Sequence, residues 1–176
     1  MAQVTELESA AAAPVLSDSS EDPSTQLLLL TTAGLSAGAA GIHFAVAPGH
    51  LAENLLAGYF FIAVAIAQAL WAILIPRYPR RRLLVIGAVG NLLVAVIWLT
   101  VRLYGSPLGE HPWTPEPVGL TDAMSAAFEV VAVVSVWVLC SPLRLRIRRI
   151  AGPALATGVI LVALTSAALL NVGAVE

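Results

Sequence analysis

A set of histidine and carboxylate side chains in this sequence carries the donor atoms that could bind a cation. His50 and Glu53 have the spacing H-x-x-E, and His43 lies seven residues before His50. Glu129 lies in an apolar stretch much later in the chain. Imidazole nitrogen together with carboxylate oxygen suits a transition metal such as Zn, Cu, Fe or Ni. These four residues are therefore the predicted ligands of a metal site, although no compact motif such as H-E-x-x-H joins them.

Two other interpretations of the same groups are open. Acidic side chains inside a membrane often form proton relays or polar ligand pockets. Alternatively, the polar residues are structural ion pairs and hydrogen bonds, and the chain is a non-enzymatic accessory or assembly protein with partners in the membrane. An enzyme is expected only if it is metal-dependent, because the sequence contains no recognisable nucleophile–base pair or phosphate-binding loop.

Further ionisable residues are expected to support this site from loops and helix ends. They are Arg102, Glu110, His111, Glu116 and Asp122. Asp122 and Glu129 are seven residues apart, which places them on one face of a helix. A charge as deep as Glu129 costs on the order of 2.5–3.5 kcal/mol in a membrane and needs a partner. Helical rise brings His43 within reach of Glu129 if their helices are neighbours, and it places Arg102 nearer to Asp122.

Five apolar segments must position these residues. The chain has 176 residues, of which 59% are hydrophobic and 11% are charged, far from the composition of a soluble domain. Each apolar segment has about 21–22 residues and would form a helix of roughly 32 Å, which matches the hydrocarbon core of a bilayer. The segments are residues 27–47, 54–75, 83–104, 121–141 and 152–173. The sequence thus predicts an all-α, polytopic membrane bundle of five transmembrane helices over residues 27–176.

The expected boundaries of this domain follow from prolines and from the composition of the amino-terminal region. Pro48-Gly49 is expected to end the first helix, so that His50 and Glu53 lie in a short loop. Residues 1–26 are acidic and contain no Lys or Arg, which predicts a disordered tail. The acidic region before a long apolar segment also argues against a cleaved signal peptide.

The arginines predict the orientation. The chain has no lysine, and eight of its nine arginines lie in the second and fourth connections between the apolar segments. These are Arg77, Arg80, Arg81, Arg82, Arg144, Arg146, Arg148 and Arg149. The positive-inside rule places both connections and the amino terminus in the cytoplasm, and the histidines and the carboxy terminus on the outer side. Arg80, Arg81 and Arg82 are also candidates for binding anionic lipid head groups.

Small and amide residues predict how the helices pack. Gln68 and Asn91 share a depth and are expected to form a hydrogen bond between their helices. Glycines permit close helix approach at Gly34, Gly38, Gly41, Gly87 and Gly90. No basic stripe with interleaved aromatic residues occurs outside the loops, so no nucleic-acid partner is expected.

The spacing of these residues also resembles that of a known group of proteins. The pattern consists of His43, Pro48-x-His50-x-x-Glu53, Gly58, Gln68, Arg77-x-x-Pro79, Asn91, Trp98-x-x-x-Arg102-x-x-Gly105-x-Pro107-x-Gly109, Glu116-x-x-Gly119-x-x-Asp122 and Glu129. It is similar to uncharacterised bacterial multi-pass membrane proteins over residues 43–129. The resemblance implies a location in the bacterial cytoplasmic membrane and supplies no catalytic assignment.

Overall fold

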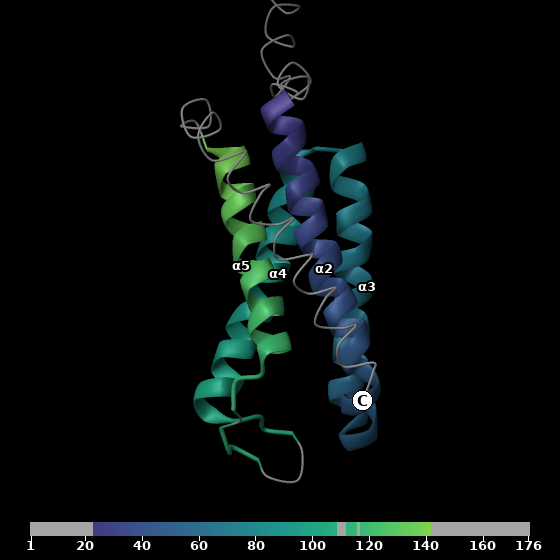
Figure 1. Cartoon of the computed structure of the whole chain (residues 1–176), viewed down its shortest axis with the longest axis vertical. Helices are drawn as coiled ribbons and strands as arrows, with labels where there is room; N and C mark the ends of the chain where they lie inside the picture. Colours follow the sequence, from purple (N-terminus) through teal and green to yellow (C-terminus); the bar gives the residue numbers. More distant parts are fainter. Residues whose placement is uncertain (1–22, 109–111, 116, 142–176) are drawn as a thin grey trace, which may run out of the picture.

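Four long helices run alternately up and down in the computed structural model, which describes residues 23–141 except 109–111 and 116 (Figure 1). They are α2 (Pro23–Glu53), α3 (Leu55–Arg77), α4 (Arg81–Tyr104) and α5 (Leu120–Cys140). Each is long and apolar enough to cross a membrane. No strand occurs in the described part of the chain. The predicted all-α fold is confirmed for these four helices, and their length and composition are compatible with the predicted membrane spans, whereas the predicted helix at 152–173 lies outside the described residues.

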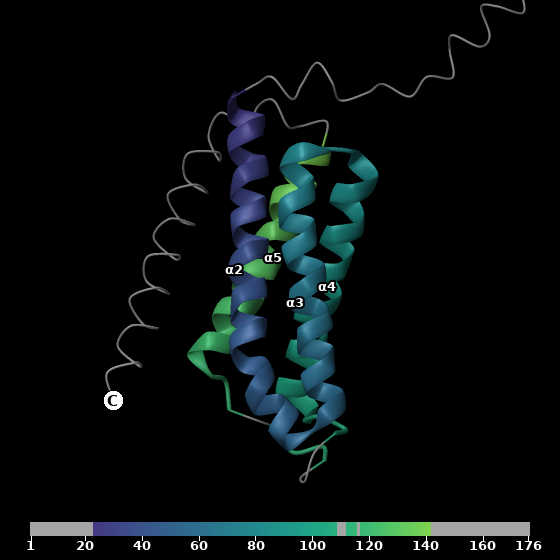
Figure 2. The same ribbon diagram turned by 90° about the vertical axis from the view of Figure 1, so that its right-hand side faces the viewer.

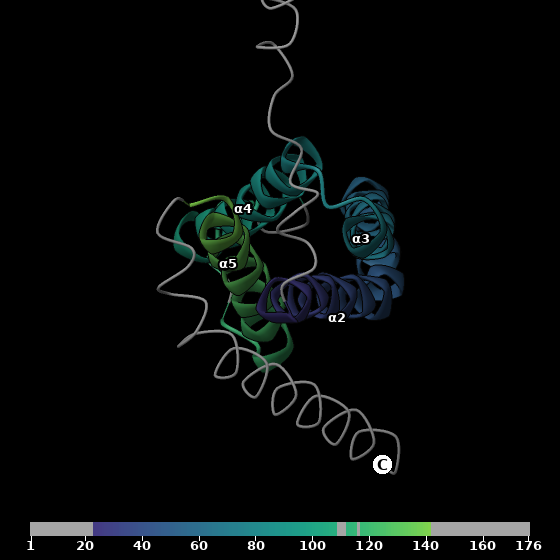
Figure 3. The same cartoon turned by 90° about the horizontal axis from the view of Figure 1, so that it is seen from above.

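The helices surround a shared interior when the bundle is seen from above (Figure 3). α2 packs against α3 and α5, α4 packs against α5, and α3 and α4 pack against each other less closely. The buried apolar core includes Leu28, Leu35, Ala39, Trp71, Ile75, Phe128, Ala132 and Val136. Large apolar side chains on the outer faces are exposed instead, as lipid-facing residues of a membrane bundle are expected to be.

The turn between α2 and α3 corrects one prediction. α2 does not end at Pro48 but continues to Glu53, so His50 and Glu53 lie in its last turn rather than in a loop. A proline removes one helical N–H but keeps a helical φ angle, and membrane helices tolerate this loss. Asn54 then caps α3, because its side chain accepts hydrogen bonds from the N–H groups of Leu56 and Ala57 at 3.0 and 3.1 Å.

The turn between α3 and α4 is short (Figure 2). The indole N–H of Trp71 donates to the carbonyl of Leu83 at 2.9 Å, which ties α3 to the first turn of α4. Gly87 faces the Trp71 ring so closely that a Cβ atom there would overlap the indole. We call this end of the bundle, with its four arginines between residues 77 and 82, the arginine end. The opposite end, which holds the α2–α3 turn and the α4–α5 loop, is the loop end.

Candidate functional site

The centre of the candidate site is a contact between α2 and α5 in the interior of the bundle. Nε2 of His43 lies 2.9 Å from Oε1 of Glu129. Only 5% of His43 and 1% of Glu129 is exposed, although both residues carry ionisable groups. Because α2 and α5 are neighbours, the predicted approach of these two side chains is confirmed.

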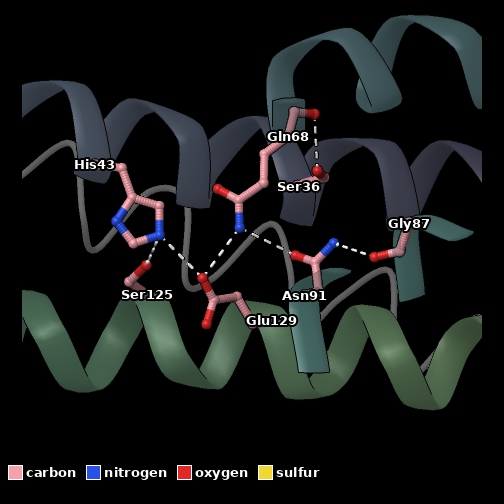
Figure 4. A network of polar contacts seen from close by, with 7 residues as sticks. All are labelled: Ser36, His43, Gln68, Gly87, Asn91, Ser125 and Glu129. Atoms are coloured by element: carbon pink, nitrogen blue, oxygen red, sulfur yellow. Dashed lines mark hydrogen bonds and ion pairs between the residues drawn. The ribbon is translucent and has the colours of Figure 1, made fainter. Parts of the chain in front are cut away.

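Two further polar side chains complete the surroundings of this contact (Figure 4). The Ser125 hydroxyl, one turn before Glu129 on α5, lies 3.3 Å from Nε2 of His43. Nε2 of Gln68, on α3, donates to Oε1 of Glu129 at 3.0 Å and to Oδ1 of Asn91 at 3.1 Å. The predicted hydrogen bond between Gln68 and Asn91 is therefore confirmed, and it is joined directly to the buried carboxylate.

The network includes all four described helices. The Asn91 amide donates to the carbonyl of Gly87 on α4 at 2.8 Å. The Ser36 hydroxyl of α2 donates to the backbone carbonyl of Gln68 at 2.9 Å. Each of these polar side chains is buried. Since buried polar groups without partners are costly, these bonds restrict the register at which the helices can pack and hold Glu129 in one position.

His43 keeps one nitrogen outside this network. Among the described residues, its Nδ1 atom is buried and has no hydrogen-bond partner. Figure 4 shows this nitrogen on the side of the ring that is turned away from both Glu129 and Gly87. The imidazole therefore presents one nitrogen to the carboxylate and the other toward the loop end.

The other two predicted ligands form a separate pair. Nδ1 of His50 lies 4.0 Å from Oε2 of Glu53, and 80% of the Glu53 side chain is exposed. The ring of Phe61 on α3 is stacked on His50 with centroids 4.2 Å apart, and it also contacts the ring of His43 at 5.5 Å. Within the described part of the chain, no three His, Cys, Asp or Glu residues lie together in a way that could hold a metal ion. The structure thus brings the four predicted ligands together in two pairs.

Two of the five predicted supporting residues form a pair in the described part of the chain. The Arg102 guanidinium donates to Oδ2 of Asp122 at 2.5 Å and to the carbonyl of Pro117 at 2.8 Å. The predicted pairing of Arg102 with Asp122 is confirmed, and it joins α4 to the start of α5 near the loop end. Glu110, His111 and Glu116 lie outside the described residues.

No family model, no curated protein and no solved structure matches this chain. The function is therefore argued from the geometry of the site.

Three contacts of the site were not predicted from the sequence, and they involve Gln68, Ser125 and Phe61. Gln68 was predicted to bond to Asn91 and not to Glu129, and neither Ser125 nor Phe61 was predicted to belong to the site. Ser125 precedes Glu129 by four residues, so helical spacing alone places both on one face of α5. Phe61 and the link from Gln68 to Glu129 depend on which helices are neighbours, and spacing within one helix carries no such information.

The chemistry of the central contact follows from charge. A carboxylate and a neutral imidazole carry one negative charge between them, and one added proton makes the pair neutral. Burial strongly disfavours a net charge, because desolvation costs several kcal/mol per ion. In the neutral pair, one proton lies between Nε2 of His43 and Oε1 of Glu129, which fits their 2.9 Å separation, and the other imidazole proton lies on Nδ1. Gln68 adds a donor to the same oxygen and favours its role as an acceptor.

Proposed function

We propose that this chain is a cation-handling membrane protein and that the cation is a proton held between His43 and Glu129. The observation that supports this proposal most strongly is the 2.9 Å contact between two buried ionisable groups from different helices. Ionisable residues inside membrane bundles are rare and commonly belong to ion or proton pathways. The pair needs no further ligand to hold a proton.

The donor set favours a proton over the transition metal suggested by the sequence. Zinc sites in proteins have at least three protein ligands, whereas His43 and Glu129 supply two. Oε1 of Glu129 also accepts a hydrogen bond from Gln68, which occupies part of its lone-pair space. His50 stacks on Phe61 and pairs with the exposed Glu53, so both residues would have to move inward to join them. A metal site remains the alternative outcome of the experiment below.

The direction of proton exchange follows from the groups on either side of the pair. Toward the arginine end, the network continues through the amides of Gln68 and Asn91, which do not titrate. Toward the loop end lies the free Nδ1 of His43. We therefore infer that the proton exchanges with the loop end. The distribution of arginines supports an extracytoplasmic location for this end, with five membrane spans in a bacterial cytoplasmic membrane and the amino terminus in the cytoplasm.

Infrared difference spectroscopy on detergent-purified protein, together with metal analysis, tests this proposal. Spectra recorded at low and high pH should contain a carboxyl band that is absent from Glu129→Gln. The band should shift in His43→Ala, because that substitution removes a hydrogen-bonding partner of the carboxyl group. Glu53→Gln is the matched control, since it makes the same chemical change at an exposed carboxylate of the loop end. It should leave the Glu129 band in place.

The other outcomes are equally specific. Stoichiometric metal that is lost in both His43→Ala and His50→Ala would overturn the proton proposal in favour of the four-residue metal site. Metal-free protein with no Glu129 carboxyl band at any pH would also contradict it.

That second outcome would support the role of an accessory or assembly protein. The observation that favours this candidate is the polar network itself, because it joins four helices through Ser36, Gln68, Asn91 and Glu129. Such a network specifies one helix arrangement whether or not a proton moves. In that case Glu129→Ala should destabilise the protein, and no spectroscopic signal of protonation should accompany the loss.

A further inference from the structure

A basic patch lies at the opposite end of the molecule from the free nitrogen of His43. Its four arginines are exposed, and all of them lie in the six-residue segment 77–82 that contains the α3–α4 turn. We define the basic patch by these residues, which are Arg77, Arg80, Arg81 and Arg82. Among the described residues, none of the four has a carboxylate within ion-pair distance. One guanidinium nitrogen of Arg77 donates to the carbonyl of Ile73 in its own helix. The patch is therefore a concentration of positive charge that the described part of the chain does not neutralise.

The turn holds these side chains in a defined frame. The N–H of Tyr78 donates to the carbonyl of Leu74 at 2.8 Å, and the N–H of Arg80 donates to the carbonyl of Tyr78 at 2.6 Å. The bond from Trp71 to Leu83 fixes the first turn of α4 against α3. A ligand at this turn would therefore meet arginines whose backbone positions are already set, which lowers the entropy lost on binding.

The start of α4 adds to the positive character of the basic patch. Arg80 is the N-cap residue and makes no side-chain capping bond, and the first turn contains no acidic residue. The first N–H groups of a helix have no partner within the helix and attract anions. At this turn, the arginines and the amino-terminal end of α4 therefore both favour a negatively charged ligand.

Apolar side chains border the basic patch on both helices. Ile73 on α3 is 52% exposed, and Ile86 on α4 is 69% exposed. Val85 is exposed beside them. A ligand that satisfies both surfaces carries an anionic group at one end and hydrocarbon at the other. This arrangement distinguishes a phospholipid from a free anion, for which the apolar border has no use.

We propose that the basic patch binds the head group of an anionic phospholipid, with the phosphate at Arg80, Arg81 and Arg82 and the acyl chains along the exposed apolar faces of α3 and α4. The bound lipid would contact both helices beside the short turn that joins them. This inference does not depend on the proton site, because the basic patch shares no residue with it.

Native mass spectrometry of the whole chain in detergent tests the proposal, with phosphatidylglycerol and phosphatidylcholine as the lipid probes. Wild-type protein should retain phosphatidylglycerol in preference to phosphatidylcholine. The triple variant Arg80→Gln, Arg81→Gln, Arg82→Gln should bind phosphatidylglycerol at least about tenfold more weakly, because each basic residue near a membrane surface contributes on the order of 1 kcal/mol. The matched variant Arg80→Lys, Arg81→Lys, Arg82→Lys keeps the charge and should retain most of the binding.

Two further measurements complete the design. Raising the ionic strength should weaken phosphatidylglycerol binding to wild-type protein, which tests the charge without any substitution. Millimolar inorganic phosphate should not displace the lipid, because it lacks the acyl chains. Equal retention of both lipids, unchanged binding by the glutamine variant, or displacement by inorganic phosphate would each overturn the assignment of this patch to an anionic phospholipid.

Discussion

His43 of α2 and Glu129 of α5 face each other at 2.9 Å, although 86 residues separate them in the chain. Neither side chain reaches the surface, so the contact depends on the packing of the bundle. Gln68 donates to the same carboxylate oxygen, and the carboxylate thus holds three helices together. This relationship leads to the first prediction.

Glu129→Ala should lower the free energy of unfolding by about 3–5 kcal/mol, the range found when one partner of a buried pair is removed. The reason is that it leaves His43 and Gln68 buried without their acceptor. Glu129→Gln should cost less, because its carbonyl oxygen still accepts a hydrogen bond. Unfolding in mixed micelles with a denaturing detergent, followed by circular dichroism, measures both. Glu53→Ala is the control and should change stability by no more than about 0.5 kcal/mol. Equal effects at the two positions would contradict the buried network.

Gln68 and Asn91 should show a measurable coupling energy. In a double-mutant cycle with Gln68→Leu and Asn91→Leu, we expect a coupling of about 0.6 kcal/mol, as for other hydrogen bonds between membrane helices. Gln68→Leu alone should cost more than Asn91→Leu alone, because only Gln68 also bonds to Glu129. The same unfolding assay supplies the four free energies. If the two substitutions were strictly additive, the 3.1 Å bond between the amides would contribute nothing.

Two glycines of α4 form a natural matched pair. A Cβ atom at Gly87 would overlap the Trp71 indole, whereas nothing lies within 4 Å of the corresponding atom at Gly90. Gly87→Ala should therefore destabilise the protein by about 1–3 kcal/mol, as overpacking does in other cores. The indole cannot simply move aside without breaking its bond to Leu83. Gly90→Ala should be neutral or slightly stabilising, and thermal unfolding of the two variants in one detergent gives the comparison. Equal midpoints would refute the close approach.

The same design applies to α2. A Cβ atom at Gly38 would lie 2.8 Å from Cε2 of Phe128, whereas Gly41 has nothing within 4 Å. Gly38→Ala should be the more harmful substitution, by a smaller margin than at Gly87, because the Phe128 ring makes no hydrogen bond that opposes its movement. Thermal unfolding again measures the difference. A greater loss at Gly41 would show that α2 and α5 pack through another face.

Arg102 and Asp122 should be coupled in a salt-dependent manner. Their side chains are 13% and 31% exposed, so solvent screens the pair in part. We expect a coupling energy of about 1 kcal/mol from a double-mutant cycle with Arg102→Gln and Asp122→Asn, and a smaller value at high salt. The buried pair of His43 and Glu129 should respond less to salt. A coupling that is independent of ionic strength would argue that the pair is shielded from water.

The sequence predicted the helices well because each apolar segment has the length that a bilayer requires. The four described spans agree with the predicted ones to within two residues except at both ends of α2, which begins four residues earlier than predicted, at Pro23, and ends six residues later, at Glu53. α2 continues through Pro48, so His50 and Glu53 lie in one more turn of helix rather than in the predicted loop. The error arose because a membrane helix tolerates a proline that more often ends a helix in water.

A contact of the site was predictable from the sequence only where two polar residues lie at the same depth in the membrane. Arg102 with Asp122 and Gln68 with Asn91 were matched by their distances from the helix ends. The role of Phe61 between two histidines and the link from Gln68 to Glu129 depend on helix adjacency and rotation, which depth does not specify. For the same reason, the predicted close approach is found at Gly38 and Gly87 and not at Gly41 and Gly90.

Solid-state NMR in lipid bilayers tests the central claim most directly, because it detects the shared proton between His43 and Glu129. Protein with ¹⁵N-labelled histidine and ¹³C-labelled glutamate should show a dipolar contact between a protonated imidazole Nε2 and a glutamate carboxyl carbon. This contact should disappear in Glu129→Gln and persist in Glu53→Gln. A His43 ring without any carboxyl contact, or one whose Nε2 carries a metal ion in place of a proton, would contradict the account.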